Sequence, residues 1–420
     1  MLKNLYMDKL GKKAKIAYMQ SSNLTLKKRN LVLKKYNTYL KKNLTKILSE
    51  NKKDIYKARL KKIEKSLIER LILNKKKVNE IIKSIKEIIR FKDPIGNTLS
   101  SWKRPNNLII SKISIPIGVI GVIYESRPNV TSDIAALCFK TGNPVILRGG
   151  SEAFFSNKIL AKLFRKSLKI NRCNPNFIQL VKKRDRNNVD YLLSKMQKYV
   201  DVIIPRGGKN LVKKVQKKSK VPTIGHLEGI CHVYIDKTAN LKMAIKITKN
   251  AKMRNVSICG AAETLLLDKS VLKTHCEPML IELLKSGCKI IGDKSIRKVF
   301  SGELKEAKNK DWDTEYLSPT ISVKCVNGID DAIKHINKHG TSHTDAIITE
   351  NKKMAKKFLS SVNSAIAIHN ASTQFADGGE FGFGAEVGIS TGRLHPRGPV
   401  GLKELTTYKY IVEGKGQIRK

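Results

Sequence analysis

IPIGVIGVIYESRPNVTSDIAALCFKTGNPVILRGGSEA, residues 115–153, is the stretch that decides the fold of this chain. Its first part, IPIGVIGVIYE (115–125), reads as a nearly continuous apolar strand, which is typical of a sheet covered on both faces. PVILRG (144–149) is a second short apolar strand, and a helical stretch separates the two. Strands that alternate with helices in this way favour a parallel α/β sheet.

The same alternation continues toward the carboxyl end and predicts two α/β domains. Three more short apolar strands follow in the order NFIQLV (176–181), VDVIIPRGG (200–208) and CHVYID (231–236). A further set of strands predicts a second α/β unit and comprises ETLLLD (263–268), TISVKCV (320–326), DAIITE (345–350) and AIAIHN (365–370).

Helices precede this region, and strand-like segments flank it. From about Ala14 to Phe91 the apolar residues recur at helical spacing, and the helices stop at DPIGN (93–97), where proline and glycine break the pattern. LIISKISI (108–115) roughly alternates apolar and polar side chains, as a half-buried strand does. The glycine-rich final segment ends on a strand-like run, LTTYKYIV (405–412).

Length and composition indicate a soluble globular protein. The chain has 420 residues, 41% of them hydrophobic, which is enough for two or three domains. It lacks a run of eighteen apolar residues and a secretory signal core, so we expect neither a membrane span nor export. Seven cysteines without a CxxC pair suit neither disulfides nor zinc, and no HExxH motif occurs. We therefore expect a cytoplasmic protein without a bound metal.

The formal charge of +48 would suit a polyanion partner such as nucleic acid. The basic residues are nevertheless spread along the whole chain, and Lys, Ile and Asn recur together, which is the bias of an AT-rich coding sequence. We therefore expect no nucleic-acid partner, although a positive field raises the local concentration of anionic substrates.

Two glycine pairs follow buried strands and are candidates for a phosphate site. They lie in RGGSEA (148–153) and in IPRGGKN (204–210). Glycine lets the backbone approach a ligand closely, and a following helix directs its amino end at phosphate. Neither pair matches the dinucleotide fingerprint GxGxxG, so a plain tight turn stays open as the alternative.

Cys259 is the candidate nucleophile, in RNVSICGAAETLLLD (254–268) between a helical stretch and a strand. The small residues that follow it, Gly260 to Ala262, leave room around its sulfur. A thiolate forms a thioester from an activated acyl group and so divides one difficult step into two easier ones. It needs a nearby cation or backbone N–H groups to stabilise its charge. On spacing alone, a structural cysteine stays open as well.

Longer motifs add a family resemblance that runs in order over almost the whole chain. Residues 115–153 closely resemble the glutamate-5-semialdehyde dehydrogenase family of proline biosynthesis, also called gamma-glutamyl phosphate reductases, in the aldehyde dehydrogenase superfamily. The same resemblance holds for DVIIPRGGKNLV (201–212), GHLEGICHVYID (225–236), NASTQFADGGEFGFGAEVGIS (370–390) and GPVGLKELTTYKY (398–410).

The resemblance implies an aldehyde dehydrogenase-like α/β fold, with two parallel-sheet domains and a small oligomerisation β-hairpin. Mapped onto this chain, it predicts amino-terminal helices of the cofactor domain (1–97), an oligomerisation hairpin (98–115, with 404–418), an NADP-binding domain (116–227), a catalytic domain (228–395) and a carboxy-terminal oligomerisation segment (396–420). A homo-oligomer is expected.

The resemblance also implies the chemistry. The Cys259 thiolate would attack the acyl phosphate of L-glutamyl 5-phosphate, and hydride from NADPH would reduce the resulting thioester to L-glutamate 5-semialdehyde. Each tetrahedral stage carries negative charge on oxygen, for which Asn129 and the Cys259 backbone N–H are the expected donors. A thioester discharged by hydride needs no activated water. An oxidative aldehyde dehydrogenase of the same fold stays the alternative.

Cofactor and substrate residues follow by position in the family motifs. Arg148 suits a ribose phosphate through paired hydrogen bonds, and Ser151 adds a hydroxyl without a competing negative charge. Gly207 and Gly208 are expected against the pyrophosphate. The other predicted ligands are Glu315 for the nicotinamide ribose and Arg393 and Arg397 for the anionic groups of the substrate.

Two further expectations concern the carboxy-terminal segment and the partners. Arg397 could alternatively only tie that segment to the core. Because the acyl phosphate is unstable, a transient contact with the kinase that makes it, glutamate 5-kinase, is a possible partner interaction.

Overall fold

A computed structural model of the chain describes residues 4–183, 185–383 and 385–419. These residues belong to two compact units. The first unit consists of Met1–Gly225, Gly382–Gly388 and Val400–Lys420, and the second of His226–Phe381 and Ile389–Pro399. Both units are α/β, as predicted. None of the described helices is long and apolar enough to cross a membrane.

Four parallel strands of the described chain form the sheet of the first unit. They are β3 (Ile120–Tyr124), β4 (Val145–Gly149), β5 (Ile178–Leu180) and β6 (Val202–Arg206). The spatial order is β5-β4-β3-β6. Every residue of β3 is buried, because this strand has a neighbour on each side and is covered on both faces. Its sequence is therefore a continuous apolar run.

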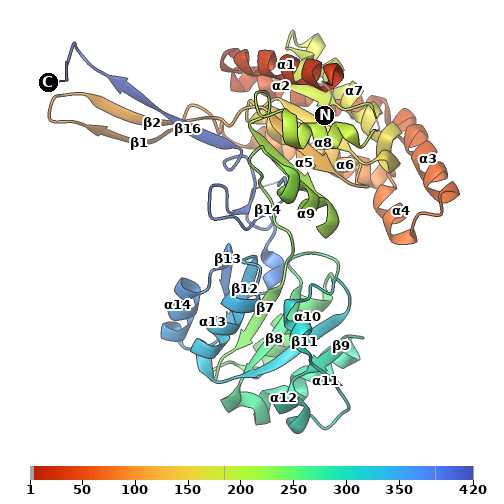
Figure 1. Cartoon of the computed structure of the whole chain (residues 1–420), viewed down its shortest axis with the longest axis vertical. Helices are drawn as coiled ribbons and strands as arrows, with labels where there is room; N and C mark the ends of the chain where they lie inside the picture. The colour runs from red at the N-terminus through yellow and green to blue at the C-terminus, as the bar shows by residue number, and fades with distance from the viewer. Residues whose placement is uncertain (1–3, 184, 384, 420) are drawn as a thin grey trace. The chain divides into compact units, whose positions relative to one another are not determined.

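Helices cover both faces of this sheet (Figure 1). Their bounds are α1 (Leu5–Met19), α2 (Leu26–Lys42), α3 (Leu44–Leu60), α4 (Lys65–Leu71), α5 (Lys75–Arg90), α6 (Asn129–Lys140), α7 (Phe154–Ile170), α8 (Asn187–Lys195) and α9 (Lys209–Lys218). Val122 of β3 packs with α2, α5, α6 and α7 in one apolar cluster. Ile123 points to the opposite face and packs with α1, α8 and α9.

An antiparallel arm extends from the first unit (Figure 1). It contains β1 (Thr98–Lys103), β2 (Ile109–Pro116) and β16 (Thr406–Glu413), in the order β1-β2-β16. All of β1 is exposed. The predicted small β-hairpin is therefore present, and the end of the chain adds a third strand to it.

Seven parallel strands of the described chain form the sheet of the second unit, in the order β10-β9-β11-β8-β7-β12-β13. They are β7 (Cys231–Ile235), β8 (Ala262–Asp268), β9 (Lys289–Gly292), β10 (Lys305–Glu306), β11 (Thr320–Val326), β12 (Thr344–Ile348) and β13 (Ile366–His369). One face is covered by α10 (Leu241–Met253), α11 (Glu277–Lys285) and α12 (Lys294–Val299), and the other by α13 (Gly328–His339) and α14 (Lys352–Ser361). A short antiparallel pair, β14 (Ile389–Ser390) with β15 (Gly398–Pro399), completes the unit.

The prediction of one continuous strand over 115–125 is wrong. The segment is divided between the end of β2 and β3, which belong to different sheets. Gly118 makes the turn with φ +139, and a Cβ there would lie 2.1 Å from the Asp201 carboxylate. That carboxylate accepts a hydrogen bond from the Val119 N–H at 2.7 Å. An apolar composition alone does not reveal this change of sheet.

Candidate active site

The carboxyl ends of β3, β4 and β6 bring together residues predicted to bind the cofactor. Glu125 follows β3, Arg148 is the last residue but one of β4, and Gly207 follows β6. The chain runs from β3 outward to β5 on one side, and β6 then pairs with the other side of β3. Ligands of parallel α/β sheets bind at the carboxyl ends of the strands where the order reverses in this way.

Arg148 is half-buried, and its Nη1 donates to the Gly149 carbonyl at 2.6 Å. Burial lowers the pKa of Arg148, whereas the nearby Glu152 carboxylate raises it. The guanidinium stays charged and can face a phosphate. The Ser151 hydroxyl donates to Glu152 Oε1 at 3.0 Å. The carboxylate of Glu152, the next residue, therefore lies beside the Ser151 hydroxyl, and the role of Ser151 in cofactor binding stays a prediction.

Gly207 and Gly208 lie directly before α9. The Gly208 N–H donates to Glu125 Oε2 at 2.8 Å. A Cβ on Gly207 would lie 2.5 Å from the same oxygen, so a larger residue here would push the carboxylate aside. The amino end of a helix carries a positive partial charge and attracts anions. An anionic group already contacts this position, and the site therefore suits a pyrophosphate once Glu125 moves aside.

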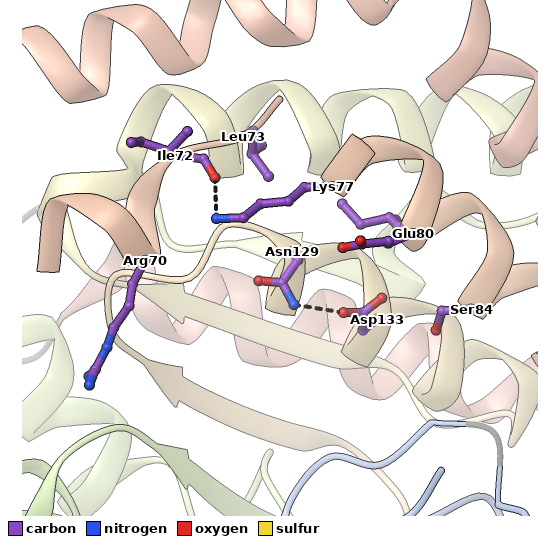
Figure 2. A pocket seen from close by; sticks show the side chains of 9 residues that line it. Arg70, Ile72, Leu73, Lys77, Glu80, Ser84, Asn129 and Asp133 are labelled. Carbon is purple, nitrogen blue, oxygen red and sulfur yellow. Dashed lines mark hydrogen bonds between the residues drawn. The ribbon is translucent and has the colours of Figure 1, made fainter. Parts of the chain in front are cut away.

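Asn129 is the first residue of α6, and its amide is engaged locally. Its Nδ2 donates to Asp133 Oδ2 at 3.0 Å, one helical turn further on (Figure 2). Both side chains line a pocket of about 310 Å³ in the first unit. Burial raises the pKa of Asp133 to about 6. The role of Asn129 as an oxyanion donor stays a prediction.

In the second unit, Cys259 lies at the amino ends of three adjacent strands. It precedes β8, while His226 precedes β7 and His343 directly precedes β12. One ring nitrogen of each histidine and the Cys259 sulfur all lie within 4.8 Å of one another. Cys259 is half-buried. The thiol is thus accessible and has two imidazoles beside it.

The contacts of the two histidines indicate how their protons are arranged. His226 Nδ1 lies 2.8 Å from the Ile389 carbonyl oxygen. A carbonyl only accepts, so Nδ1 carries the proton, and Nε2 of the neutral ring is the basic nitrogen. The His343 ring is buried, 4.8 Å from the His226 ring between centroids. Its Nδ1 lies 2.9 Å from Thr344 Oγ1, and its buried Nε2 has no hydrogen-bond partner among the described residues.

Gly229 holds the backbone close to Cys259. A Cβ on Gly229 would lie 2.1 Å from the Cys259 carbonyl oxygen, so no other residue fits. The Gly229 N–H donates to Glu315 Oε1 at 2.8 Å, which brings the predicted ribose ligand near the nucleophile. Cys231 Sγ donates to the Cys259 carbonyl at 3.1 Å. Burial raises the pKa of the Cys231 thiol well above its ordinary value, so Cys231 stays protonated.

The two arginines predicted to bind substrate are both exposed. Arg397 Nη2 donates to the Asn363 carbonyl and lies 3.4 Å from Asn363 Oδ1, beyond α14. These contacts support the alternative in which Arg397 ties its segment to the unit. Its role in substrate binding, like that of Arg393, stays a prediction.

Several residues around these sites escaped the sequence interpretation. They are His226, His343, Glu125 and Asp133. A signal for the histidines existed: each precedes a predicted strand by a few residues, as Cys259 does. Using that signal would have required knowing that β8, β7 and β12 are neighbours.

Comparison with known proteins agrees with this fold. The aldehyde dehydrogenase family model matches residues 4–311. A gamma-glutamyl phosphate reductase of Parvibaculum lavamentivorans is 45% identical over 99% of this chain and 98% of its own length. One of Mesorhizobium japonicum is 49% identical over 89% of this chain and 87% of its own length. The crystal structure of the gamma-glutamyl phosphate reductase of Thermotoga maritima has a TM-score of 0.96 at 40% identity, covering 99% of this chain and 100% of that chain.

The matches to the Parvibaculum and Thermotoga proteins each cover 99% of the chain. The described strands and helices match a solved structure at the same time. The chain therefore belongs to the gamma-glutamyl phosphate reductase family, within the aldehyde dehydrogenase family.

Proposed function

We propose that this enzyme reduces L-glutamyl 5-phosphate to L-glutamate 5-semialdehyde and phosphate, with NADPH as hydride donor and Cys259 as nucleophile. The observation that carries the proposal is the half-buried Cys259 thiol with ring nitrogens of His226 and His343 within 4.8 Å. Relatives that are 45% or more identical over most of the chain are gamma-glutamyl phosphate reductases, which supports this substrate. The proposed reaction is a step of proline biosynthesis, and we propose that the enzyme acts in the cytoplasm.

The histidines prepare the nucleophile. The basic nitrogen of one imidazole takes the thiol proton, and the resulting imidazolium lies beside the thiolate. The Cys259 sulfur then bonds to the acyl carbon of the substrate, the bond from that carbon to the phosphate oxygen breaks, and phosphate leaves with the electron pair. The product of this half-reaction is a thioester on Cys259.

NADPH, when bound, supplies the hydride that converts this thioester to the aldehyde. Arg148 with Ser151 would hold the ribose phosphate, Gly207 with Gly208 the pyrophosphate, and Glu315 the nicotinamide ribose. Glu152 contacts Ser151 and lies near Arg148, so the preference for NADPH over NADH depends on how far Arg148 offsets that carboxylate. Asn129 and the Cys259 N–H are the proposed oxyanion donors, each worth about 3–4 kcal/mol of barrier.

The enzyme is proposed to act as a homo-oligomer through the arm of β1, β2 and β16. The arm exposes several large apolar side chains, including Trp102, Tyr410 and Val412. Such a surface is typical of a protein interface. A transient contact with glutamate 5-kinase, which makes the unstable acyl phosphate, is proposed as well.

The reverse reaction tests the proposal. Purified enzyme is incubated with glutamate 5-semialdehyde, phosphate and either NADP or NAD, and cofactor reduction is followed by absorbance. We expect phosphate-dependent reduction that favours NADP and disappears in Cys259→Ser. The matched control is Cys325→Ser, the other half-buried cysteine, which should keep its activity. Turnover without phosphate would instead indicate the oxidative aldehyde dehydrogenase alternative.

A further inference from the structure

A pocket of the first unit lies where α4, α5 and the start of α6 meet, and Arg148 and Gly207 do not line it. Its volume is about 310 Å³, at the lower end of the range for small-molecule sites. Figure 2 shows its lining, which comes from the end of α4, the residues after it, α5 and α6: Arg70, Ile72, Leu73, Lys77, Glu80, Ile81, Ser84, Asn129 and Asp133. The polar residues of α5 recur at positions 77, 80 and 84, and those of α6 at 129 and 133, so each set lies on one face of its helix.

The charges of the lining are balanced, unlike those of the rest of the chain. Lys77 and Arg70 supply two cations, and Glu80 and Asp133 supply two carboxylates. The whole chain has only 35 acidic residues against 83 basic ones. A pocket selected for a phosphate or another polyanion would not be expected to carry two of these scarce carboxylates. A zwitterion, with one cationic and one anionic group, matches the pocket.

The carboxylate of Asp133 is suited to bind a cationic group of a ligand. Its Oδ2 accepts from Asn129 Nδ2, but its Oδ1 is buried and accepts no hydrogen bond from any described residue. A buried carboxylate oxygen without a donor is costly, by about 1–3 kcal/mol or more. An ammonium group supplies the missing donor and the opposite charge.

Lys77 is held in place to receive the anionic group. Its Nζ donates to the Ile72 carbonyl at 2.8 Å and to the Glu69 carbonyl at 3.1 Å, as Figure 2 shows in part. An ammonium has three N–H donors, so these two contacts orient the side chain and leave one donor for a ligand. Arg70 extends away from the other labelled side chains in Figure 2 and so marks the rim of the pocket.

We propose that this pocket binds the α-ammonium and α-carboxylate of the amino-acid substrate, with the ammonium on Asp133 and Glu80 and the carboxylate on Lys77. This inference rests on the proposed function, because it specifies how that substrate is recognised. It makes Asp133 a specificity-determining residue for the amino group of the substrate.

The experiment compares two aldehydes in the reverse assay. One is glutamate 5-semialdehyde, and the other is 5-oxopentanoate, which has the same carbon chain and carboxylate but no amino group. The variants are Asp133→Asn, which keeps the size and a hydrogen-bonding oxygen, and Lys77→Ala. Their controls are Glu87→Gln and Lys83→Ala, which lie on α5, the helix of Lys77, and do not line the pocket.

We expect Asp133→Asn to raise the KM for glutamate 5-semialdehyde about tenfold or more, the loss expected for a hydrogen bond to a charged group. Its KM for 5-oxopentanoate and for NADP should change less than about twofold. Lys77→Ala should raise the KM for both aldehydes, because both carry the carboxylate, and the controls should match wild type.

Two outcomes would overturn the inference. If Asp133→Asn lowers kcat equally for both aldehydes and leaves both KM values unchanged, Asp133 only positions Asn129. If neither variant alters any constant, the pocket does not bind the substrate. Failure of the proposed function is distinguishable from both, since wild type itself would then be inactive with glutamate 5-semialdehyde and phosphate.

Discussion

Cys259 differs from the other cysteines in what surrounds its sulfur. Five cysteines are buried, and the sixth, Cys325, is half-buried but has its pKa raised, chiefly by burial. Burial also raises the pKa of Cys138, Cys231, Cys276 and Cys288. A raised pKa removes thiolate and with it nucleophilicity at neutral pH. Cys259 combines partial exposure with two neighbouring imidazoles, which makes it the reactive thiol of the described chain.

This difference predicts selective alkylation. Iodoacetamide at pH 7 should modify Cys259 before any other cysteine, as read by peptide mass spectrometry over a time course. In His343→Asn the rate at Cys259 should fall about tenfold or more, because a neighbouring base is lost. His369→Asn, a substitution of an exposed histidine in the same unit, is the control. Equal alkylation rates in the two variants would mean that His343 does not activate the thiol.

Glu125 occupies the place where a cofactor phosphate is proposed to bind. Its carboxylate accepts from the Gly208 N–H at the start of α9, so a pyrophosphate must displace it against like-charge repulsion. Glu125→Gln should therefore bind NADPH more tightly, by about 0.3–1 kcal/mol or roughly two- to fivefold in Kd. Fluorescence titration of NADPH measures this, with Glu87→Gln as control. Weaker binding in the variant would show that Glu125 supports the cofactor instead.

At the scale of elements, sequence patterns predicted strands better than their assignment to sheets. The strand over TISVKCV has the predicted bounds as β11, because turn-forming residues, Ser318-Pro319 and Asn327-Gly328, flank it on both sides. CHVYID continues the first series of strands along the chain, yet β7 pairs with β8 and β12 in the second unit. The short strand β9 escaped prediction, since only four residues, KIIG, carry its signal.

The candidate sites show the same difference between what a local sequence segment indicates and what only the arrangement of the elements in space reveals. Cys259 and Arg148 could be proposed from the chain, because each lies in a segment that resembles the family motifs, and their roles stay predictions. His343 and Asp133 could not be predicted, because their proposed roles depend on residues more than 50 positions away in the sequence. His343 lies near Cys259, and Asp133 lines a pocket with Lys77. Only the strand order and the packing of α5 on α6 bring these residues together.

Packing of α5 against α6 also predicts a pH dependence of stability. Burial raises the pKa of Asp133 from an ordinary 3.8 to about 6 in the folded chain, and Asn129 and Arg206 partly oppose the shift. The charged groups that face it from α5 are Lys77 and Glu80. A carboxyl with a raised folded pKa favours folding when protonated. Its contribution is therefore present below about pH 4 and is lost as the pH rises through 6.

Asp133→Asn removes this titration. Relative to wild type, the free energy of unfolding of the variant should increase between pH 4.5 and pH 7.5, by about 1–3 kcal/mol, and then stay level. Urea denaturation at a series of pH values measures the difference, with Glu87→Gln as the control. A difference that does not vary with pH would show that Asp133 has an ordinary pKa in the folded chain.

At the scale of the whole molecule, the charge of +48 bears on the proposed self-association. Copies of such a chain repel one another, so an assembly needs a surface where apolar contact outweighs repulsion. The arm provides one. Tyr408, Tyr410 and Val412 alternate along one face of β16, and Trp102 of β1 lies on the same face, its ring 6.2 Å from that of Tyr410 between centroids.

If the arm forms the oligomer interface, charged substitutions on its apolar face should reduce oligomer formation. Introducing charges on its apolar face, Tyr410→Asp with Val412→Asp, should lower the mass measured by sedimentation at micromolar protein, because burying an unpaired carboxylate at an interface is costly. Lys409→Ala, on the opposite face of β16, should leave the mass unchanged. Added salt should strengthen association of wild type by screening the net charge, but it should not rescue the double variant, in which desolvation rather than long-range repulsion opposes contact. An unaltered mass in the double variant would place the interface elsewhere on the chain.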